Sequence, residues 1–266
     1  MTNLDLPPIG FGTWKLKRKK CLKAVEDALN IGYRLIDTAQ LYFNEKWVGK
    51  AIANSEISAD EIIVATKIWV TRMCPWRVKR STKRSRKKLG VSSIDILYVH
   101  WPALMYKPKK TLAAMSKLMD EGIIENIAVA NFTPDLIEEA LTILEKPIIA
   151  NQVEMHPWLQ QKELRDYLQK KEIRLIAYSP LAHGNIFQIP ELQQIANKHN
   201  TTVIAVALKW NMNENAIPIP KASSFEHIKE NYEAINLELD PEDMELINNI
   251  TKEKRFINPP ILSPDW

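Results

Sequence analysis

Residues 94–100 read Ile-Asp-Ile-Leu-Tyr-Val-His, a mostly apolar run that ends on an imidazole. Residues 62–67 read Ile-Ile-Val-Ala-Thr-Lys and end on an ammonium group. Residues 34–37 read Arg-Leu-Ile-Asp and end on a carboxylate, which Tyr42 follows shortly afterwards. Continuous apolar runs are typical of parallel strands that are covered on both faces. In a closed parallel barrel the carboxyl ends of the strands share one mouth, so these side chains are expected to meet there.

Strand-like runs of this kind alternate with helical patterns along the chain, which indicates repeated β-α units around a parallel sheet. Eight strands are predicted, over residues 9–14, 34–37, 62–68, 94–100, 126–131, 148–154, 174–179 and 216–221. Helices are predicted over residues 19–30, 45–53, 76–89, 111–120, 134–144, 161–170, 190–198 and, from 200 or 201, to 210. We therefore expect one α/β domain over residues 1–266, a single (β/α)8 TIM barrel with an extra helix at 240–250 and an irregular C-terminal tail.

A doubly wound open sheet is the alternative that the same eight strands leave open. Such a sheet binds a dinucleotide through a glycine-rich phosphate loop. Here Gly10-Phe11-Gly12 is not followed by a third glycine, and the whole chain contains seven glycines. The barrel is therefore favoured, and any dinucleotide must be held without that loop.

Composition places the chain among ordinary globular proteins. Of its 266 residues, 45% are hydrophobic and 26% are charged. The opening residues lack the basic and apolar regions of a signal peptide, and no apolar stretch approaches the roughly 18 residues of a membrane span. We expect a cytoplasmic protein with no membrane partner. The two cysteines, Cys21 and Cys74, have neither disulfide-framework nor zinc-site spacing and are expected to be inert thiols.

Positive charge is concentrated between residues 72 and 88, which hold nine Lys and Arg residues and no acid. A solvated helix face is the favoured interpretation of this run, and a nucleic-acid partner is not expected. A weak inward stripe at helical spacing is formed by Val78, Thr82, Ser85 and Leu89.

Short sequence motifs lie at or next to the predicted strands. They are Ile9-Gly10-Phe11-Gly12-Thr13-Trp14, Asn151-Gln152-Val153-Glu154, Tyr178-Ser179-Pro180-Leu181 and Ile219-Pro220-Lys221. Together with the polar residues at the ends of the first runs, they resemble the aldo-keto reductase family, and within it the bacterial and archaeal 2,5-diketo-D-gluconate reductase-like members. The resemblance runs from about Leu6 to Trp266. It implies an NAD(P)H-dependent oxidoreductase that transfers a hydride to the carbonyl of a small aldehyde or ketone.

The resemblance also implies a role for each of four polar residues. Tyr42 would be the general acid and Lys67 its activator. Asp37 would be the partner of the lysine, and His100 would orient the carbonyl. These roles suit the residue types, because a phenol with a pKa of about 10 is a poor proton donor at neutral pH. A neighbouring ammonium lowers that pKa, and a carboxylate keeps the ammonium charged and oriented. Each residue alone is more often structural, so the prediction depends on their conjunction.

For the cofactor, the resemblance implies NADPH, held in a groove at the same mouth. Asn131 and Gln152 would bind the carboxamide, and Tyr178 would stack on the nicotinamide ring. The remaining contacts that the resemblance implies are Thr13, Asp37, Ser179, Leu181, Lys221, Ser223, Ser224, His227, Glu230 and Asn231.

Several positions depart from the family pattern. Ala130 stands where a serine is usual, Ala128 where a glycine is usual, and Ala222 where a serine usually follows the lysine. His227 takes the place of an arginine that clamps the adenosine 2′-phosphate. A mostly neutral imidazole cannot replace a permanently charged guanidinium group with its forked set of donors. We therefore expect NADPH to be used with tolerance of NADH.

Three tryptophans that follow strands, Trp14, Trp69 and Trp101, would by resemblance wall the substrate pocket, although tryptophans at strand ends are also common core plugs. An apolar aromatic pocket wall discriminates only weakly among small carbonyl compounds. The connection over residues 103–110 is short for the family and implies an open mouth. The expected partner is a small carbonyl substrate, and the family resemblance favours a monomer.

Two rival functions remain open. A barrel can also carry lyase, isomerase or metal-dependent hydrolase chemistry, since fold alone does not fix function. The five histidines show no HExxH or other paired-ligand spacing, so no metal site is predicted. The second rival is a nucleotide-binding barrel that reduces nothing and uses the basic helix at 72–88 as a regulatory or scaffold contact. The complete set of four polar residues favours the enzyme.

Overall fold

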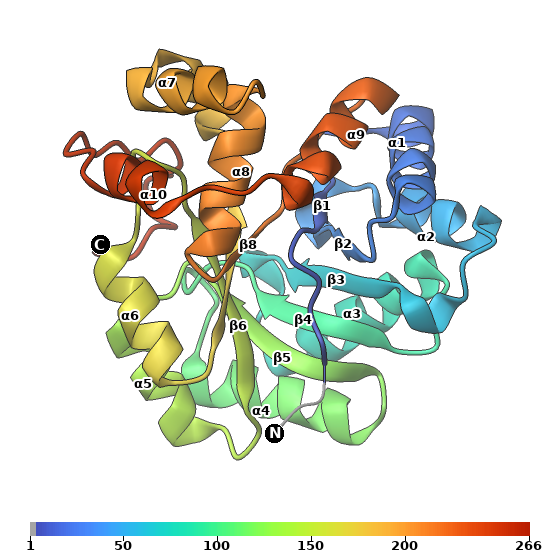
Figure 1. The fold of residues 1–266 in the computed structure, drawn as a ribbon. Helices are drawn as coiled ribbons and strands as arrows, with labels where there is room; N and C mark the ends of the chain where they lie inside the picture. The colour runs from blue at the N-terminus through green and yellow to red at the C-terminus, as the bar shows by residue number, and fades with distance from the viewer. Residues whose placement is uncertain (1–3) are drawn as a thin grey trace.

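The computed structural model describes residues 4–266 and confirms the predicted α/β barrel. The strands lie in the order β1 to β8, and each is parallel to its neighbour. In the described chain they are β1 (Phe11–Gly12), β2 (Leu35–Asp37), β3 (Ile63–Ile68), β4 (Ile94–Val99), β5 (Ile124–Ala130), β6 (Ile148–Glu154), β7 (Arg174–Tyr178) and β8 (Ala216–Pro218). Figure 1 shows these strands at the centre of the molecule with helices around them.

The helices follow the strands in the order that a barrel requires. They are α1 (Arg18–Ile31), α2 (Glu45–Asn54), α3 (Pro75–Leu89), α4 (Pro108–Asp120), α5 (Pro134–Ile143), α6 (Lys162–Lys170), α7 (Pro190–Lys198), α8 (Val203–Asn213), α9 (Phe225–Glu233) and α10 (Pro241–Asn248). Five of them, α3, α4, α5, α7 and α10, begin on a proline, whose fixed backbone angle suits the first helical position. Helix α9 has no counterpart among the predicted helices, whereas α10 is the predicted extra helix.

Backbone hydrogen bonds join β1 to the end of β8 and close the barrel. The N–H of Gly10 donates to the carbonyl of Pro218, and the N–H of Gly12 donates to the carbonyl of Pro220, each at 3.0 Å. A Cβ atom on Gly12 would lie 2.6 Å from the carbonyl oxygen of Ile219. These glycines therefore allow close strand packing, and the absence of a phosphate-loop pattern is consistent with that use.

Both faces of the strands are buried, which explains the continuous apolar runs. Side chains along a strand alternate between two buried clusters. The smaller cluster contains Ala65, Tyr98, Ala128 and Ala130, and the larger one joins the opposite faces of the strands to the helices. The alanines at 128 and 130, which depart from the family pattern, thus belong to the smaller cluster.

The basic segment forms most of α3, and several of its charges are paired within the molecule. Lys79 and Lys83 both lie against Glu121, at 2.5 and 3.4 Å, and Lys88 lies 2.8 Å from the buried Glu45. Basic residues in the last turn also interact favourably with the helix dipole. These contacts favour the interpretation of α3 as a solvated barrel helix.

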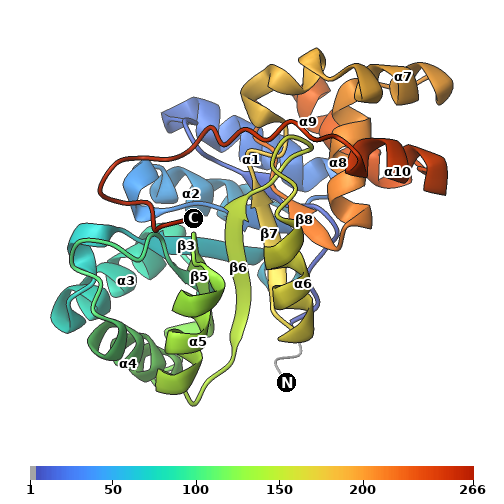
Figure 2. The ribbon, with the colours of Figure 1, turned by 90° about the vertical axis from the view of Figure 1, so that its left-hand side faces the viewer.

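After α10 the chain continues as a tail over residues 251–266 that has no helix or strand. Figure 2 shows this tail, in red, leaving α10 and running across the barrel. Among residues 4–266, no helix has the length and hydrophobicity needed to cross a bilayer. Cys21 is buried in α1, and burial raises the pKa of its thiol to about 12, so it stays unreactive.

Candidate active site

The four polar residues singled out from the sequence come together at the carboxyl ends of the strands. Asp37 ends β2, Lys67 is next to last in β3, and His100 directly follows β4. Tyr42 lies in the short helical turn between β2 and α2. Parallel strands of a barrel all point their carboxyl ends at one mouth, so residues far apart in sequence become neighbours there.

Lys67 and Asp37 form a buried ion pair. The Nζ atom of Lys67 lies 2.5 Å from Oδ1 of Asp37 and donates to the carbonyl of Thr38 at 3.0 Å. The second carboxylate oxygen accepts a hydrogen bond from Nε2 of Gln152 at 2.9 Å. Burial lowers the pKa of Lys67, and the charge of Asp37 offsets this effect only in part.

Tyr42 and His100 lie beside this ion pair. The Nζ atom of Lys67 is 5.2 Å from the centre of the Tyr42 ring, and the rings of Tyr42 and His100 are 6.0 Å apart. Burial raises the pKa of Tyr42 well above its ordinary value, and the negative charge of Asp37 raises it further. The net pKa of Tyr42 therefore lies above its ordinary value, and the expectation that Lys67 acts to lower it stays a prediction. The charge of Lys67 is already compensated by Asp37, so burial decides the outcome.

His100 is neutral at neutral pH. Burial lowers the pKa of its imidazole well below the ordinary value, and the nearby Lys67 adds to this effect. Its Nδ1 atom is buried and has no hydrogen-bond partner within residues 4–266. A neutral imidazole can donate one hydrogen bond and accept another, which suits the binding of a carbonyl oxygen.

A cavity of about 630 Å³ opens at this mouth. Its size suits a small-molecule ligand. The predicted residues that line it are Thr13, Trp14, Asp37, Tyr42, Trp69, His100, Trp101, Asn131, Gln152, Tyr178, Ser179, Leu181 and Lys221. Lys67 lies behind this lining, where it holds Asp37.

Side-chain amides and a phenol occupy one wall of the cavity. Asn131 has a φ of 64°, a left-handed conformation that asparagine tolerates better than most residues. Its amide donates to the carbonyl of His100 at 3.0 Å and accepts a hydrogen bond from the hydroxyl of Tyr178 at 2.9 Å. Asn131 and Gln152 offer both donors and acceptors, which is the chemistry that a carboxamide ligand requires.

Three tryptophans line the cavity near the catalytic candidates. The ring of Trp14 lies 4.7 Å from that of Tyr42, and the ring of Trp69 lies 5.3 Å from that of His100. Trp101 is mostly buried and also reaches the cavity. The predicted aromatic wall is therefore placed at the mouth by the structure.

The structure leaves the rest of the predicted cofactor residues outside this lining. They lie on α9 and in the turn before it, and they are Ser223, Ser224, His227, Glu230 and Asn231. The side chain of Ser224 caps α9 by accepting from the N–H of His227 at 3.4 Å. Asn231 is buried, whereas His227 is exposed.

Several cavity residues were not predicted from the sequence, and three of them come from the C-terminal tail. Ile257, Pro259 and Leu262 reach the cavity from the C-terminal tail. The tail has no periodic pattern that would have placed it, and its apolar residues were the only signal. These three tail residues add apolar surface to the cavity.

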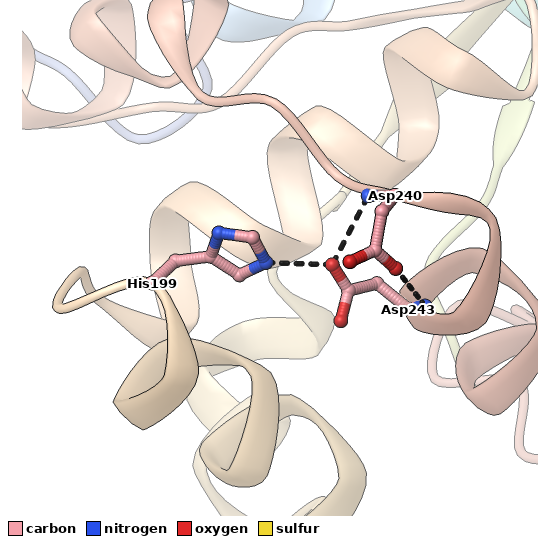
Figure 3. A group of neighbouring side chains, drawn as sticks. All are labelled: His199, Asp240 and Asp243. Atoms are coloured by element: carbon pink, nitrogen blue, oxygen red, sulfur yellow. Dashed lines mark hydrogen bonds and ion pairs between the residues drawn. The ribbon is translucent and has the colours of Figure 1, made fainter.

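Away from the mouth, the described residues include one group of metal-binding types, formed by His199, Asp240 and Asp243 (Figure 3). The ammonium of Lys198 lies 2.5 Å from Asp240 and 2.9 Å from Asp243. The remaining carboxylate oxygens accept from His199 or from backbone N–H groups at the start of α10. Because the ammonium of Lys198 already compensates both carboxylates, this group serves to join α7 to α10. We call Lys198, His199, Asp240 and Asp243 the clasp.

Comparison with known proteins supplies the family. The sequence profile of the aldo/keto reductase family matches residues 8–252. The methylglyoxal reductase DkgB of Escherichia coli O157:H7 is 34% identical, over 99% of this chain and 100% of its own length. The chain belongs to the aldo/keto reductase family. The glyoxal reductase of Bacillus subtilis (strain 168) is 36% identical to this aldo/keto reductase, over 95% of this chain and 91% of its own.

Solved structures agree with the fold of this aldo/keto reductase. The aldo-keto reductase MGS-M4, from a Medee basin deep-sea metagenome library, superposes with a TM-score of 0.93 at 34% identity, covering 99% of this chain and 98% of its own. A chain provisionally described as 2,5-diketo-D-gluconic acid reductase B gives 0.94 at 30% identity, covering 98% and 94%. The family resemblance predicted from the sequence is thus confirmed, and the protein is an aldo/keto reductase enzyme.

Proposed function

We propose that this aldo/keto reductase reduces small aldehydes and ketones, such as methylglyoxal and glyoxal, with a reduced nicotinamide dinucleotide. The observation that carries the proposal is the meeting of Tyr42, His100 and the Lys67–Asp37 pair at one cavity of about 630 Å³. Relatives that match nearly the whole chain are a methylglyoxal reductase and a glyoxal reductase, which supports this substrate class.

The cavity residues fit a nicotinamide. The phenol of Tyr178 would stack on the ring, and the amides of Asn131 and Gln152 would bind its carboxamide. When bound, the reduced nicotinamide supplies the hydride to the carbonyl carbon. The protein itself would fix the ring next to the substrate carbonyl. Because both reactants are then held in place, a bimolecular step becomes effectively unimolecular.

Tyr42 would supply the proton. Because burial raises the pKa of Tyr42, its phenol keeps its proton at neutral pH until negative charge develops on the carbonyl oxygen. Lys67 lies close enough to stabilise the phenolate that remains, and Asp37 holds the lysine in place. The neutral imidazole of His100 would orient the carbonyl oxygen toward Tyr42.

The proposed cofactor is NADPH, with tolerance of NADH. Lys221 lines the cavity beside β8, where its ammonium can approach a phosphate. His227 is exposed on α9, three residues after the cap Ser224. An imidazole at this place binds a 2′-phosphate less strongly than a guanidinium would. A moderate preference for NADPH follows.

The test is an assay of NADPH and NADH oxidation with methylglyoxal, glyoxal and a panel of other aldehydes and ketones. We expect carbonyl-dependent oxidation of both cofactors, faster with NADPH, and full activity after exhaustive chelation of metals. Dinucleotide binding without any carbonyl-dependent oxidation would contradict the proposal and favour the non-catalytic barrel. Activity lost on chelation would point to metal-dependent chemistry.

A further inference from the structure

Glu154 is a buried carboxylate that the proposed chemistry does not use. It is the last residue of β6, its exposed fraction is 0%, and it does not line the cavity at the mouth. The equally buried His156 places its Nε2 atom 3.1 Å from one carboxylate oxygen. Burial raises the pKa of Glu154, but its hydrogen bonds outweigh this effect and hold the pKa below the ordinary value. The carboxylate is therefore ionised at neutral pH, and its burial must be compensated by its partners.

The other partners of Glu154 are two backbone N–H groups of the C-terminal tail. The N–H of Phe256 donates to one oxygen at 2.9 Å, and the N–H of Ile257 donates to the other at 2.8 Å. Hydrogen bonds to an ionised acceptor are roughly twice as strong as neutral ones. A residue at the end of β6 thus holds a segment that follows more than 100 positions later in the sequence.

Few other polar contacts attach the tail to the barrel. In the part of the chain that the structure describes, one further hydrogen bond joins residues 251–266 to the rest, from the N–H of Lys254 to the carbonyl of Trp158 at 2.7 Å. The ring of Phe256 packs on the ring of His156, with 5.4 Å between their centres. Phe256, Ile257 and Leu262 also pack against the hydrophobic core. Among the hydrogen bonds that attach this irregular segment, however, those to Glu154 predominate.

The tail stands between two hollows. On its inner side Ile257, Pro259 and Leu262 line the active-site cavity. On its outer side Arg255 and Trp266 line a second groove, of about 800 Å³, that is bordered by residues near the starts of α5 and α6 and after α10. A groove on this side leaves little packing to oppose a movement of the tail away from the barrel.

We propose that Glu154 is a positioning residue that fastens the C-terminal tail over the mouth, and that this attachment sets how tightly the carbonyl substrate is held. Glu154 touches no reacting group and acts through the tail. If the attachment is lost, the apolar surface of Ile257, Pro259 and Leu262 leaves the cavity, and substrate binding weakens. The attachment is independent of the proposed function, whereas the effect on substrate rests on it.

The attachment is tested by limited trypsin digestion of the full chain. Trypsin sites at Lys252 and Lys254 lie at the start of the tail. The variant Glu154→Gln keeps the size of the side chain but replaces one acceptor by a donor, so at least one tail N–H loses its partner. We expect cleavage at these sites to be about tenfold faster than in the native chain. The matched control Glu238→Gln changes an exposed glutamate outside the tail and should be cut at the native rate.

A second pair of variants leaves Glu154 in place, in case its replacement prevents folding. Phe256→Pro and Phe256→Ala both remove the ring, but only the proline variant removes the N–H that Glu154 binds. We expect faster cleavage after Lys252 and Lys254 in the proline variant than in the alanine variant. Equal cleavage within this pair, together with a native rate for folded Glu154→Gln, would overturn the attachment.

The effect on substrate is tested by steady-state kinetics with methylglyoxal and NADPH. For Glu154→Gln we expect the KM for methylglyoxal to rise about tenfold, with kcat within a factor of about three and an unchanged Kd for NADPH. A purely structural role would lower the unfolding temperature and leave KM unchanged. Faster cleavage with an unchanged KM would therefore reject the link to substrate. If the native enzyme reduces no carbonyl, the proposed function fails, while the digestion still decides the attachment.

Discussion

The ion pair of Lys67 and Asp37 is the residue-scale feature on which the site depends. Both side chains are almost fully buried, at 1% and 4% exposed. Burying two charges costs more than an apolar pair of the same size, so a buried ion pair is weak support for a stabilising role. Its place behind Tyr42 supports a role in the chemistry instead.

Removing the carboxylate of this pair should destabilise the fold. Asp37→Asn leaves the ammonium of Lys67 buried without a counter-charge, and we expect a loss of about 3–5 kcal/mol in the free energy of unfolding at neutral pH. The pKa of Lys67 is already lowered by burial and will fall further in the variant. Because the unfolded chain then binds the proton more tightly, the loss should shrink as pH rises toward the ordinary lysine value of 10.5.

Denaturant unfolding at several pH values measures this effect. Asp60→Asn, at an exposed aspartate, serves as the control and should change stability little. A loss for Asp37→Asn that does not vary between neutral and alkaline pH would mean that the charge of Lys67 is not its cause.

The expected preference for NADPH over NADH also depends on a single residue, His227. In His227→Arg a permanently charged guanidinium replaces an exposed imidazole, and bidentate contact with a phosphate becomes available. We expect the Kd for NADPH to fall about tenfold and the Kd for NADH to stay unchanged. Fluorescence titration of both cofactors checks this. His227→Gln is the control, and equal gains for both cofactors would contradict the assignment.

Sequence reasoning placed the catalytic candidates well because each of them ends a strand or follows one. The rule that strand ends share a mouth is enough to bring Asp37, Lys67 and His100 together. It could not show how deeply Tyr42 is buried, and burial is the main reason that the pKa of Tyr42 is raised. The chemical roles of these residues stay predictions.

At the scale of elements, the predicted boundaries were accurate where every residue could join the hydrogen-bond ladder and less accurate at prolines. The predicted bounds of β6 agree with the structure at both ends. β8 ends at Pro218, three residues before its predicted end, since Pro218 and Pro220 have no N–H to donate to a ladder. α9 was missed by the sequence analysis, and Ile228 is its only fully buried apolar residue.

The clasp in Figure 3 makes a prediction for α10. Asp240 accepts from the N–H of Asp243 at 3.0 Å and forms a capping box at the start of the helix. Asp240→Ala should therefore lower the free energy of unfolding by about 1 kcal/mol. Burial raises the pKa of Asp243, but its hydrogen bonds outweigh this effect and hold the pKa below the ordinary value. The clasp should therefore weaken as pH falls through that lowered pKa.

Thermal or denaturant unfolding of Asp240→Ala, followed from neutral to acidic pH, measures both effects. Asp240→Asn keeps a capping side chain but not its charge, and it should lose less stability than the alanine variant. If the difference between native protein and Asp240→Ala grows toward acidic pH, the clasp does not depend on the ionised carboxylates.

At the scale of the whole molecule, closure of the barrel depends on glycines where β1 meets β8. A methyl group on Gly12 would meet the carbonyl oxygen of Ile219, a backbone atom that cannot rotate away. We expect Gly12→Ala to lower the free energy of unfolding by about 3 kcal/mol, at the upper end for overpacking. Gly122→Ala, at an open position with a φ of 65°, should cost about 1 kcal/mol. Equal losses measured by denaturant unfolding would show that closure tolerates a side chain at Gly12.

The course of the tail is the part of the whole molecule that the sequence could not predict. It is held by a carboxylate more than 100 residues earlier, and no periodicity or turn pattern encodes such a contact. The alternation of strands and helices, in contrast, is repeated around the barrel and is sufficient to predict its fold.

The most direct test of the central claim is the rate of hydride transfer in a single turnover, with NADPH and methylglyoxal, for the native enzyme and Tyr42→Phe. The variant removes one hydroxyl from the cavity and should leave the Kd for NADPH unchanged. If Tyr42 is the general acid, the rate falls by about 10²-fold or more. A rate equal to that of the native enzyme would remove Tyr42 from the mechanism and contradict the account.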